Sequence, residues 1–398
     1  MRMRDGRLLV LGDYPMGYGN GIGETLSNLL ADHPDAALFQ MHPDHLQPLA
    51  GEARGHATTF TVPRRPGSWP AIAAPLYKPI LKLRQRAAEQ QLFDRAAAVI
   101  RERRIEAVLT YPVTPWVLFA VVRLRRMFPE ARFVFFVMDD WEGHHTCFGL
   151  PFTAKRRAAL AEIVATSDVR FACSHLMQQD YQGRFGNAWQ VLHKGVDVGQ
   201  VSTRITPWRF ANILYAGGMN MFRFDAVLAF AEGLRRYREQ SGRDLTLTLL
   251  GTAPDGDHAP ALAPYPFIRM EPWVGNAECR RRMAEADVLY LPLSFAKKLD
   301  RIANLAMPTK FSEYLASGRP TIFHVHRESA VHGLAQRAGL PLLLNTTDAD
   351  AICAFLAGTE TAGVDMGAYR DRSAALLRSE FDQEVLRRRL RQALFVDA

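Results

Sequence analysis

Short apolar runs alternate along most of the chain with longer stretches in which apolar side chains recur every three or four positions. The short runs have the length of buried strands, and the longer stretches have the period of amphipathic helices. Strand-like runs include "RLLVLG", "RFVFFV", "NILYAG" and "VLYLPL". Because strand and helix signals alternate, the pattern predicts an α/β protein built from βαβ units, with parallel sheets covered by helices on both faces.

The alternation pauses once, at "HKGVDVGQVSTRITPWRF", which is rich in turn-forming residues and lacks a clear period. We therefore predict two Rossmann-like, doubly wound domains that face a cleft: an N-terminal domain over 1–196, a linker over 197–210 and a C-terminal domain over 211–375. A final helix within 376–398 stands apart from the second series. Ligands of such sheets bind beyond the carboxyl ends of the strands, so we expect the chemistry there.

The composition, 48% hydrophobic and 23% charged over 398 residues, is typical of a soluble globular protein. No apolar run approaches the roughly 20 residues that span a bilayer, and the apolar stretch near the N-terminus is too short for a signal peptide. Four cysteines without a CxxC pair fit a reducing compartment. Together these features predict a cytoplasmic protein.

The net charge of +8 favours anionic partners. Nucleic acid is not expected among them, because the chain has neither a zinc-finger spacing nor an RNP-like aromatic strand. The segment 69–91 mixes aromatic and apolar side chains with Lys78, Lys82, Arg84 and Arg86. It fits either an interfacial helix on an anionic membrane surface, peripheral on the inner face of the cell membrane, or an amphipathic helix packed on its own sheet.

The stretch "MPTKFSEYLASGRPTIF" predicts a helix from Pro308 to Ser317, ended by a left-handed Gly318 and followed by a buried strand. Lys310 then lies at the positive end of the helix dipole, where a cation is disfavoured unless an anion such as a diphosphate binds there. Glu313, one turn further on, suits the two hydroxyls of a ribose. The alternative is a solvated ion pair between residues three positions apart.

Two glycine-rich turns follow predicted strands. In "NILYAGGMNMFRFD", Gly217 and Gly218 allow close approach of a ligand and Arg223 is a candidate phosphate contact, while Asp225 is predicted to cap the next helix. In "GDYPMGYGNGIGE", the candidates for a phosphate or sugar contact are Gly19, Gly21 and Gly23. This loop lacks the third glycine of a dinucleotide fingerprint, and the chain has no Walker motif.

The stretch "FVMDDWEGHHTCF" should lie at the carboxyl end of a buried strand. Asp139 and Asp140 are candidate general bases, with a loop cap as the alternative for either, and His144 and His145 are candidate acids, bases or hydroxyl partners. A metal site that adds Cys147 is disfavoured, because the spacing matches no standard zinc pattern.

The order of "SDVRFACS", "VLHKGVD", "NILYAGG", "LTLLGT", "EADVLYLPL" and "PTKFSEYLASGRPTI" resembles the GT-B glycosyltransferases, particularly the family-4 type of bacterial polysaccharide and glycolipid synthesis. The resemblance covers most of the chain and is strongest over 165–325. It implies that Glu313 binds the donor ribose, that Lys310 serves the donor phosphates or base, and that Pro292 lies in the donor site. It also implies that no metal is used and that the final helix packs back on the N-terminal domain.

Two positions depart from that family's pattern. Leu305 stands where many members have a second glutamate, and only Arg223 offers a cation after the glycine pair. We expect transfer with retention from a UDP- or GDP-sugar to a glycolipid or oligosaccharide acceptor, with inversion by Asp139 or Asp140 as the alternative. A nucleotide-sugar epimerase, a dehydrogenase and an inactive scaffold are the other hypotheses.

Overall fold

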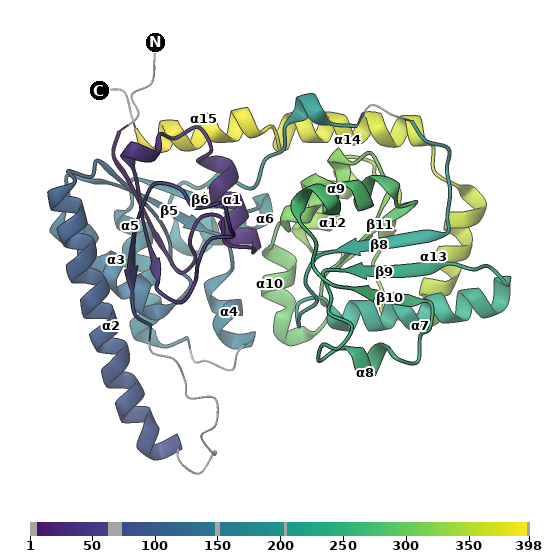
Figure 1. The fold of residues 1–398 in the computed structure, drawn as a ribbon, viewed down its shortest axis with the longest axis horizontal. Coiled ribbons are helices and arrows are strands. Elements are labelled where there is room, and N and C mark those ends of the chain that lie inside the picture. Colours follow the sequence, from purple (N-terminus) through teal and green to yellow (C-terminus); the bar gives the residue numbers. More distant parts are fainter. Residues whose placement is uncertain (1–5, 63–73, 148–151, 203–204, 396–398) are drawn as a thin grey trace. The chain divides into compact units, whose positions relative to one another are not determined.

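The computed structural model describes residues 6–62, 74–147, 152–202 and 205–395. The chain divides into two compact units, each built around one sheet (Figure 1). The first unit comprises Met1–Trp141, Gly149–Lys194 and Val385–Ala398, and the second comprises Glu142–Phe148 and Gly195–Glu384.

The first unit contains a seven-stranded sheet in the order β3-β2-β1-β4-β5-β6-β7, with every neighbouring pair parallel. Its strands are β1 (Leu8–Gly12), β2 (Leu38–Pro43), β3 (His56–Phe60), β4 (Ala107–Tyr111), β5 (Arg132–Val137), β6 (Val169–Ala172) and β7 (Gln190–Val191). The chain order reverses between β1 and β4, so this is the switch point at which a doubly wound sheet binds ligands.

Helices surround this sheet as the sequence pattern predicted. They are α1 (Gly21–Leu29), α2 (Ala74–Glu102), α3 (Pro115–Met127), α5 (Ala154–Thr166), α6 (His175–Phe185) and, from the end of the chain, α15 (Gln383–Leu394), with the short η1 (Asp35–Ala37) before β2. The short helix α4 (Trp141–Cys147) spans the division between the units.

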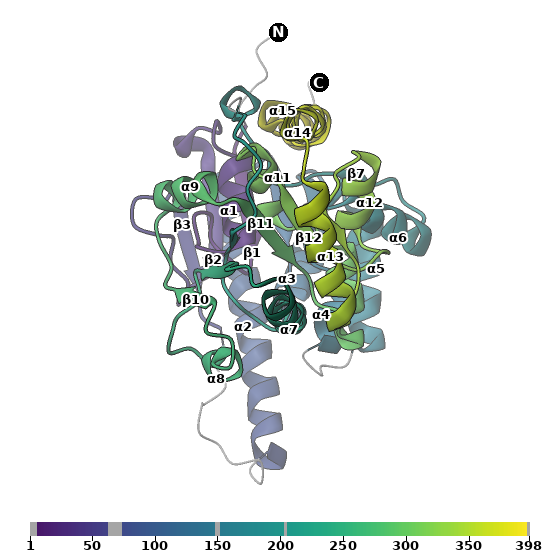
Figure 2. The same cartoon turned by 90° about the vertical axis from the view of Figure 1, so that its right-hand side faces the viewer.

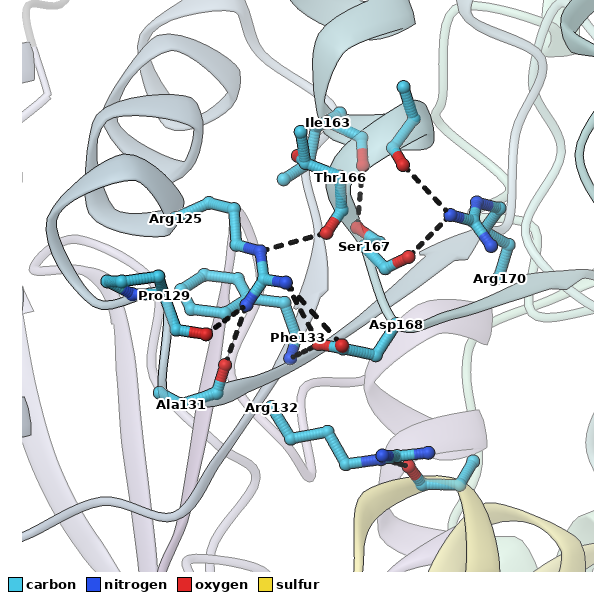
Figure 3. Close-up of polar contacts among 12 residues, drawn as sticks. Arg125, Pro129, Ala131, Arg132, Phe133, Ile163, Thr166, Ser167, Asp168 and Arg170 are labelled. Carbon is cyan, nitrogen blue, oxygen red and sulfur yellow. Dashed lines mark hydrogen bonds and ion pairs between the residues drawn. The ribbon is translucent and has the colours of Figure 1, made fainter.

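A single arginine joins three elements at the amino edge of this sheet (Figure 3). The Arg125 guanidinium, on α3, donates to the carbonyl oxygens of Thr166 and Ala131, both at 2.8 Å, and forms an ion pair at 3.4 Å with Asp168. Asp168 in turn accepts the Phe133 N–H at 2.8 Å. These bonds set the position of α3 and the end of α5 relative to β5, far along the strands from their carboxyl ends.

The second unit contains a six-stranded parallel sheet in the order β10-β9-β8-β11-β12-β13. Its strands are β8 (Asn212–Ala216), β9 (Thr246–Leu250), β10 (Ile268–Glu271), β11 (Val288–Pro292), β12 (Thr321–His324) and β13 (Leu343–Leu344). In chain order this is the 3-2-1-4-5-6 arrangement of a Rossmann sheet, with its switch point between β8 and β11.

The helices of the second unit are α7 (Phe224–Ser241), α8 (Ala259–Leu262), α9 (Asn276–Glu285), α10 (Asp300–Leu305), α11 (Thr309–Ala316), α12 (Ala330–Arg337), α13 (Ala349–Ala362) and α14 (Met366–Glu380), with η3 (Val198–Gln200) and η4 (Lys297–Leu299). The helices α7 and α13 cross in contact with each other (Figure 2), and an Arg236–Asp350 ion pair links them. Buried apolar residues from these helices and from β8, β9, β11, β12 and β13 form one core cluster, against which partly buried residues of β10 pack.

The predicted fold class, two doubly wound α/β halves, is confirmed. The sequence pattern missed β3, because this edge strand is half exposed and carries no apolar run. One cap was also wrong. The N-cap of α7 is Arg223, and Asp225 lies two positions inside the helix.

Candidate functional site

The helix α11 occupies the place that its sequence predicted. Pro308 has extended backbone angles and precedes the first helical residue, so Lys310 is the second residue of the helix. Gly318 follows the helix with φ +73°, and the buried strand β12 begins at Thr321. Because α11 runs back to the start of β12, its N-terminus lies at the carboxyl ends of the parallel strands.

Tyr314 fastens α11 to the end of β8. Its buried hydroxyl accepts the Ala216 N–H at 2.7 Å, while Phe311 and Leu315 anchor the same helix in the core. On the partly exposed side, Lys310 Nζ lies 2.7 Å from Glu313 Oε2. The structure therefore contains the ion pair, and presents it at the edge where a ligand is expected.

The glycine pair directly follows β8, whose last residue, Ala216, is bonded to Tyr314 of α11. The Tyr215 hydroxyl donates to the Gly218 carbonyl at 3.0 Å, and the Gly217 N–H donates to the Leu250 carbonyl at 2.8 Å. A Cβ added at Gly217 would meet the Tyr215 hydroxyl at 2.8 Å, whereas one added at Gly218 would meet nothing within 4 Å. Gly218 thus has open space next to it.

Two cations are close enough to influence Tyr215 electrostatically. Burial raises the pKa of the Tyr215 hydroxyl, and the charges of Arg223 and Lys310 act against that rise. Arg223 also donates to Asn220 Oδ1 at 3.0 Å. The second unit therefore gathers the predicted glycines, Arg223 and Lys310 around its switch point.

Asp225 has a role that its sequence position did not reveal. Its Oδ2 accepts the Phe295 N–H at 2.7 Å and so ties the start of α7 to the loop that follows β11. Pro292, which the resemblance placed in the donor site, is the buried last residue of β11, three positions before Phe295. The signal available in the sequence was a single acidic residue near a helix start, which reads as a cap.

A neutral histidine lies at the carboxyl end of β12, on the same edge of the second sheet. His324 is fully buried at the end of β12, with its Nδ1 2.8 Å from the Tyr290 hydroxyl and its Nε2 2.6 Å from the Thr346 carbonyl oxygen. Burial lowers the pKa of His324 to about 4, so the ring is uncharged at neutral pH. No local pattern within "PTIFHV" singles out this histidine.

The switch point of the first unit holds a carboxylate that sequence reasoning missed. Asp13 directly follows β1 and is buried. Its Oδ2 accepts the N–H groups of Val113 at 2.6 Å and Thr114 at 3.0 Å, and its Oδ1 accepts the Thr114 hydroxyl. Burial raises the pKa of Asp13, and these bonds lower it in part. In the sequence, the signal for this carboxylate was an acidic residue directly after an apolar run of strand length.

The glycine-rich loop begins at the same switch point. Gly19 and Gly21 are exposed, and Gly21 is the first residue of α1. Gly23 is buried, and a Cβ there would lie 2.4 Å from the Tyr18 carbonyl oxygen. Packing of α1 against its own loop thus requires Gly23, independently of any ligand.

The two adjacent aspartates after β5 differ in their surroundings. Asp140 is fully buried and forms an ion pair at 3.3 Å with Arg184. Asp139 is half-buried, and its charge contributes to the raised pKa of Tyr14. His144 and His145 lie on α4, with ring centroids 6.2 Å apart. Of the two carboxylates, Asp139 is the one that a substrate could reach.

Within the described residues, no group of three or more metal-binding side chains is arranged to hold an ion, and no helix is both long and apolar enough to cross a bilayer. Of the predicted membrane segment 69–91, residues 69–73 lie outside the described residues. The remainder belongs to α2, on which Leu83 is 69% exposed and Arg84 and Arg86 are also exposed.

Comparison with known proteins adds the fold family. No family model and no curated protein matches the chain by sequence. Solved structures do match. The HepE protein of Anabaena in complex with UDP is 12% identical, with a TM-score of 0.68, over 98% of this chain and 99% of that chain.

Two further structures agree with this match. The N-terminal domain of Candida albicans trehalose-6-phosphate phosphatase is 11% identical, with a TM-score of 0.68, over 98% of this chain and 97% of that one. Sucrose-phosphate synthase of Thermosynechococcus elongatus is 13% identical, with a TM-score of 0.65, over 97% of this chain and 98% of that one. Likeness at such identities concerns the fold. The chain has the GT-B fold, as its motif order predicted.

Proposed function

We propose that the protein is a glycosyltransferase that moves a sugar from a nucleotide-diphosphate sugar to a glycolipid or oligosaccharide acceptor. One observation carries the proposal: the N-terminus of α11, with Lys310 and Glu313, lies at the switch point of a Rossmann sheet beside an open glycine turn. A helix N-terminus flanked by cations suits a diphosphate. The match to a UDP complex of the same fold supports a nucleotide donor.

The proposed donor site combines cations, which suit a diphosphate, with a carboxylate, which suits the hydroxyls of a ribose. Lys310 and Arg223 would neutralise the diphosphate leaving group, which otherwise demands a metal ion, and the α11 N–H groups would add to that stabilisation. Glu313 would accept the ribose hydroxyls, and the exposed Gly218 would let the phosphates approach the backbone. Binding of the diphosphate would then separate Lys310 from Glu313.

We propose retention of configuration, with no nucleophile from the protein. If the reaction instead inverts, the base is Asp139, because Asp140 is buried in an ion pair with Arg184. The configuration of the product, determined by NMR, separates these mechanisms. Formation of an isomerised sugar without any acceptor would indicate an epimerase.

The proposal is tested by calorimetric titration of UDP and GDP into the wild type and into Lys310→Ala and Glu313→Gln. We expect one nucleotide to bind and both variants to weaken it at least tenfold. Arg281→Ala is the matched control, because Arg281 forms an ion pair at 2.5 Å with Glu278, also three residues apart, on α9 of the same unit. Absence of nucleotide binding, or unchanged affinity in both site variants, overturns the proposal.

A further inference from the structure

We propose that Tyr14, Tyr18 and Asp139 form a subsite that binds a sugar ring of the acceptor. The inference rests on the proposed function and names the substrate class at the switch point of the first unit. It concerns residues of that unit alone.

The two tyrosines form a partly exposed aromatic pair. Their ring centroids are 5.6 Å apart with an interplanar angle of 30°, and neither ring is fully buried. Both belong to the loop after β1, the strand at which the chain order of the sheet reverses. Aromatic faces carry negative charge, which favours contact with the polarised C–H groups on the apolar face of a pyranose.

The backbone that carries this pair is held on several sides. The Tyr111 hydroxyl, from β4, donates to the Tyr14 carbonyl at 2.6 Å. The Tyr18 N–H donates to the Pro15 carbonyl at 3.3 Å, and the Tyr18 carbonyl accepts the Asn20 N–H at 2.6 Å. A fixed loop presents both rings with little loss of conformational entropy on binding.

Asp139 supplies the polar part of the subsite. It follows β5, which pairs with β4, and β4 pairs with β1. Burial and the nearby charges of Asp13 and Asp139 raise the pKa of Tyr14 to about 12, so the Tyr14 hydroxyl remains a hydrogen-bond donor at neutral pH. A carboxylate acceptor and a phenolic donor beside an aromatic pair match the alternating hydroxyls and C–H groups of a sugar.

An aromatic pair beside a carboxylate favours the sugar part of an acceptor over its lipid part. An acyl or prenyl chain would gain nothing from a carboxylate at the rings, because burying a charge against hydrocarbon is unfavourable. A glycosyl ring uses both elements. The ring can come from a free oligosaccharide or from the headgroup of a glycolipid, which present the same hydroxyls.

Saturation-transfer NMR with methyl α- and β-pyranosides of glucose, galactose, mannose and glucuronic acid tests the subsite without any nucleotide. We expect at least one glycoside to bind, with affinity reduced at least fivefold in Tyr18→Ala and in Asp139→Asn, and nearly preserved in Tyr18→Phe. Tyr265→Ala is the control, because this half-buried tyrosine belongs to the second unit and precedes β10, an edge strand of that unit's sheet. Thermal unfolding of each variant establishes that it folds.

The same glycoside carried on a short alkyl chain separates the two sources. Equal affinity indicates recognition of the free sugar, and tighter binding that Tyr18→Ala abolishes indicates a glycolipid headgroup. The subsite is overturned if no glycoside binds to a protein that binds UDP or GDP, or if Tyr18→Ala binds glycosides as the wild type does. Loss of nucleotide binding with glycoside binding intact would instead overturn the proposed function.

Discussion

Lys310 lies where the helix dipole opposes a positive charge, and the structure shows how this is tolerated. Glu313 compensates the charge within one turn, at 2.7 Å, and both side chains keep part of their surface exposed. A solvent-accessible pair of this kind contributes about 1 kcal/mol or less to stability. The ion pair that the sequence offered as one alternative is present, and the diphosphate site that would use the same positions stays a prediction.

The two glycines after β8 should respond differently to a single methyl group. Gly218→Ala should leave the thermal unfolding temperature nearly unchanged, because its Cβ meets open space, but should weaken UDP or GDP binding several-fold if phosphates occupy that space. Gly217→Ala should lower the unfolding temperature, because its Cβ meets the Tyr215 hydroxyl at 2.8 Å. Unchanged nucleotide affinity in Gly218→Ala would argue against a phosphate at this turn.

His324 should make the stability of the second unit depend on pH. Its pKa falls from 6.5 to about 4 on folding, so the unfolded chain binds the proton more readily. The stabilisation is complete above about pH 6.5 and is lost as the pH falls from 6.5 towards 4. In His324→Gln, unfolding midpoints in urea should decline less steeply over that range. Equal slopes in the two proteins would contradict a neutral buried His324.

Some site residues could not be found from the sequence, for a physical reason. Asp13 and Asp225 act through bonds to the backbone of Val113 and Phe295, each many positions away along the chain. Local patterns report the element on which a residue lies, and they do not report which distant loop that element meets. The end of α11 at Gly318, whose requirement is local, was predicted, whereas the cap predicted at Asp225 was wrong.

At the scale of elements, one buried hydroxyl links α11 to the end of β8. Tyr314→Phe would remove the acceptor of the Ala216 N–H, and both residues are fully buried. An unsatisfied buried donor costs about 1–3 kcal/mol. We expect a loss of this size in the free energy of unfolding, measured in urea, with weaker nucleotide binding because the end of α11 is less well placed.

Tyr369→Phe is a suitable comparison for that experiment. Tyr369 is also buried in the second unit, on α14, but it does not join α11 to β8. It should leave nucleotide affinity unchanged. If both variants reduce nucleotide affinity equally, general loosening of the unit and not the position of α11 is responsible.

Elements with a strong local signal were predicted, and weak ones were not. The helix from Pro308 to Ser317 was placed within one residue at each end, since proline, glycine and a buried apolar stripe agree there. The edge strand β3 has only one buried residue and gains its structure from pairing with β2. Pairing of that kind is a tertiary effect that no local period records.

At the scale of the whole molecule, the net positive charge and the exposed residues of α2 favour binding to a membrane surface. Leu83, Arg84 and Arg86 offer an apolar side chain between cations, which favours an anionic lipid surface. We expect the wild type to sediment with phosphatidylglycerol vesicles at low salt and the triple variant Leu83→Asp, Arg84→Glu, Arg86→Glu to remain largely unbound. Equal binding of both proteins would exclude this helix as the contact.

The last helix gives the chain an order of assembly that differs from its order of synthesis. Arg387, on α15, donates to the Asn28 carbonyl at 2.8 Å, and Arg389 donates to the Val191 carbonyl at 2.7 Å, so the first unit includes a segment translated after the entire second unit. At typical translation rates that segment emerges on the order of tens of seconds later. During that interval, the surface of the first unit that α15 covers stays exposed on the nascent chain. We expect a nascent-chain chaperone to bind at that surface.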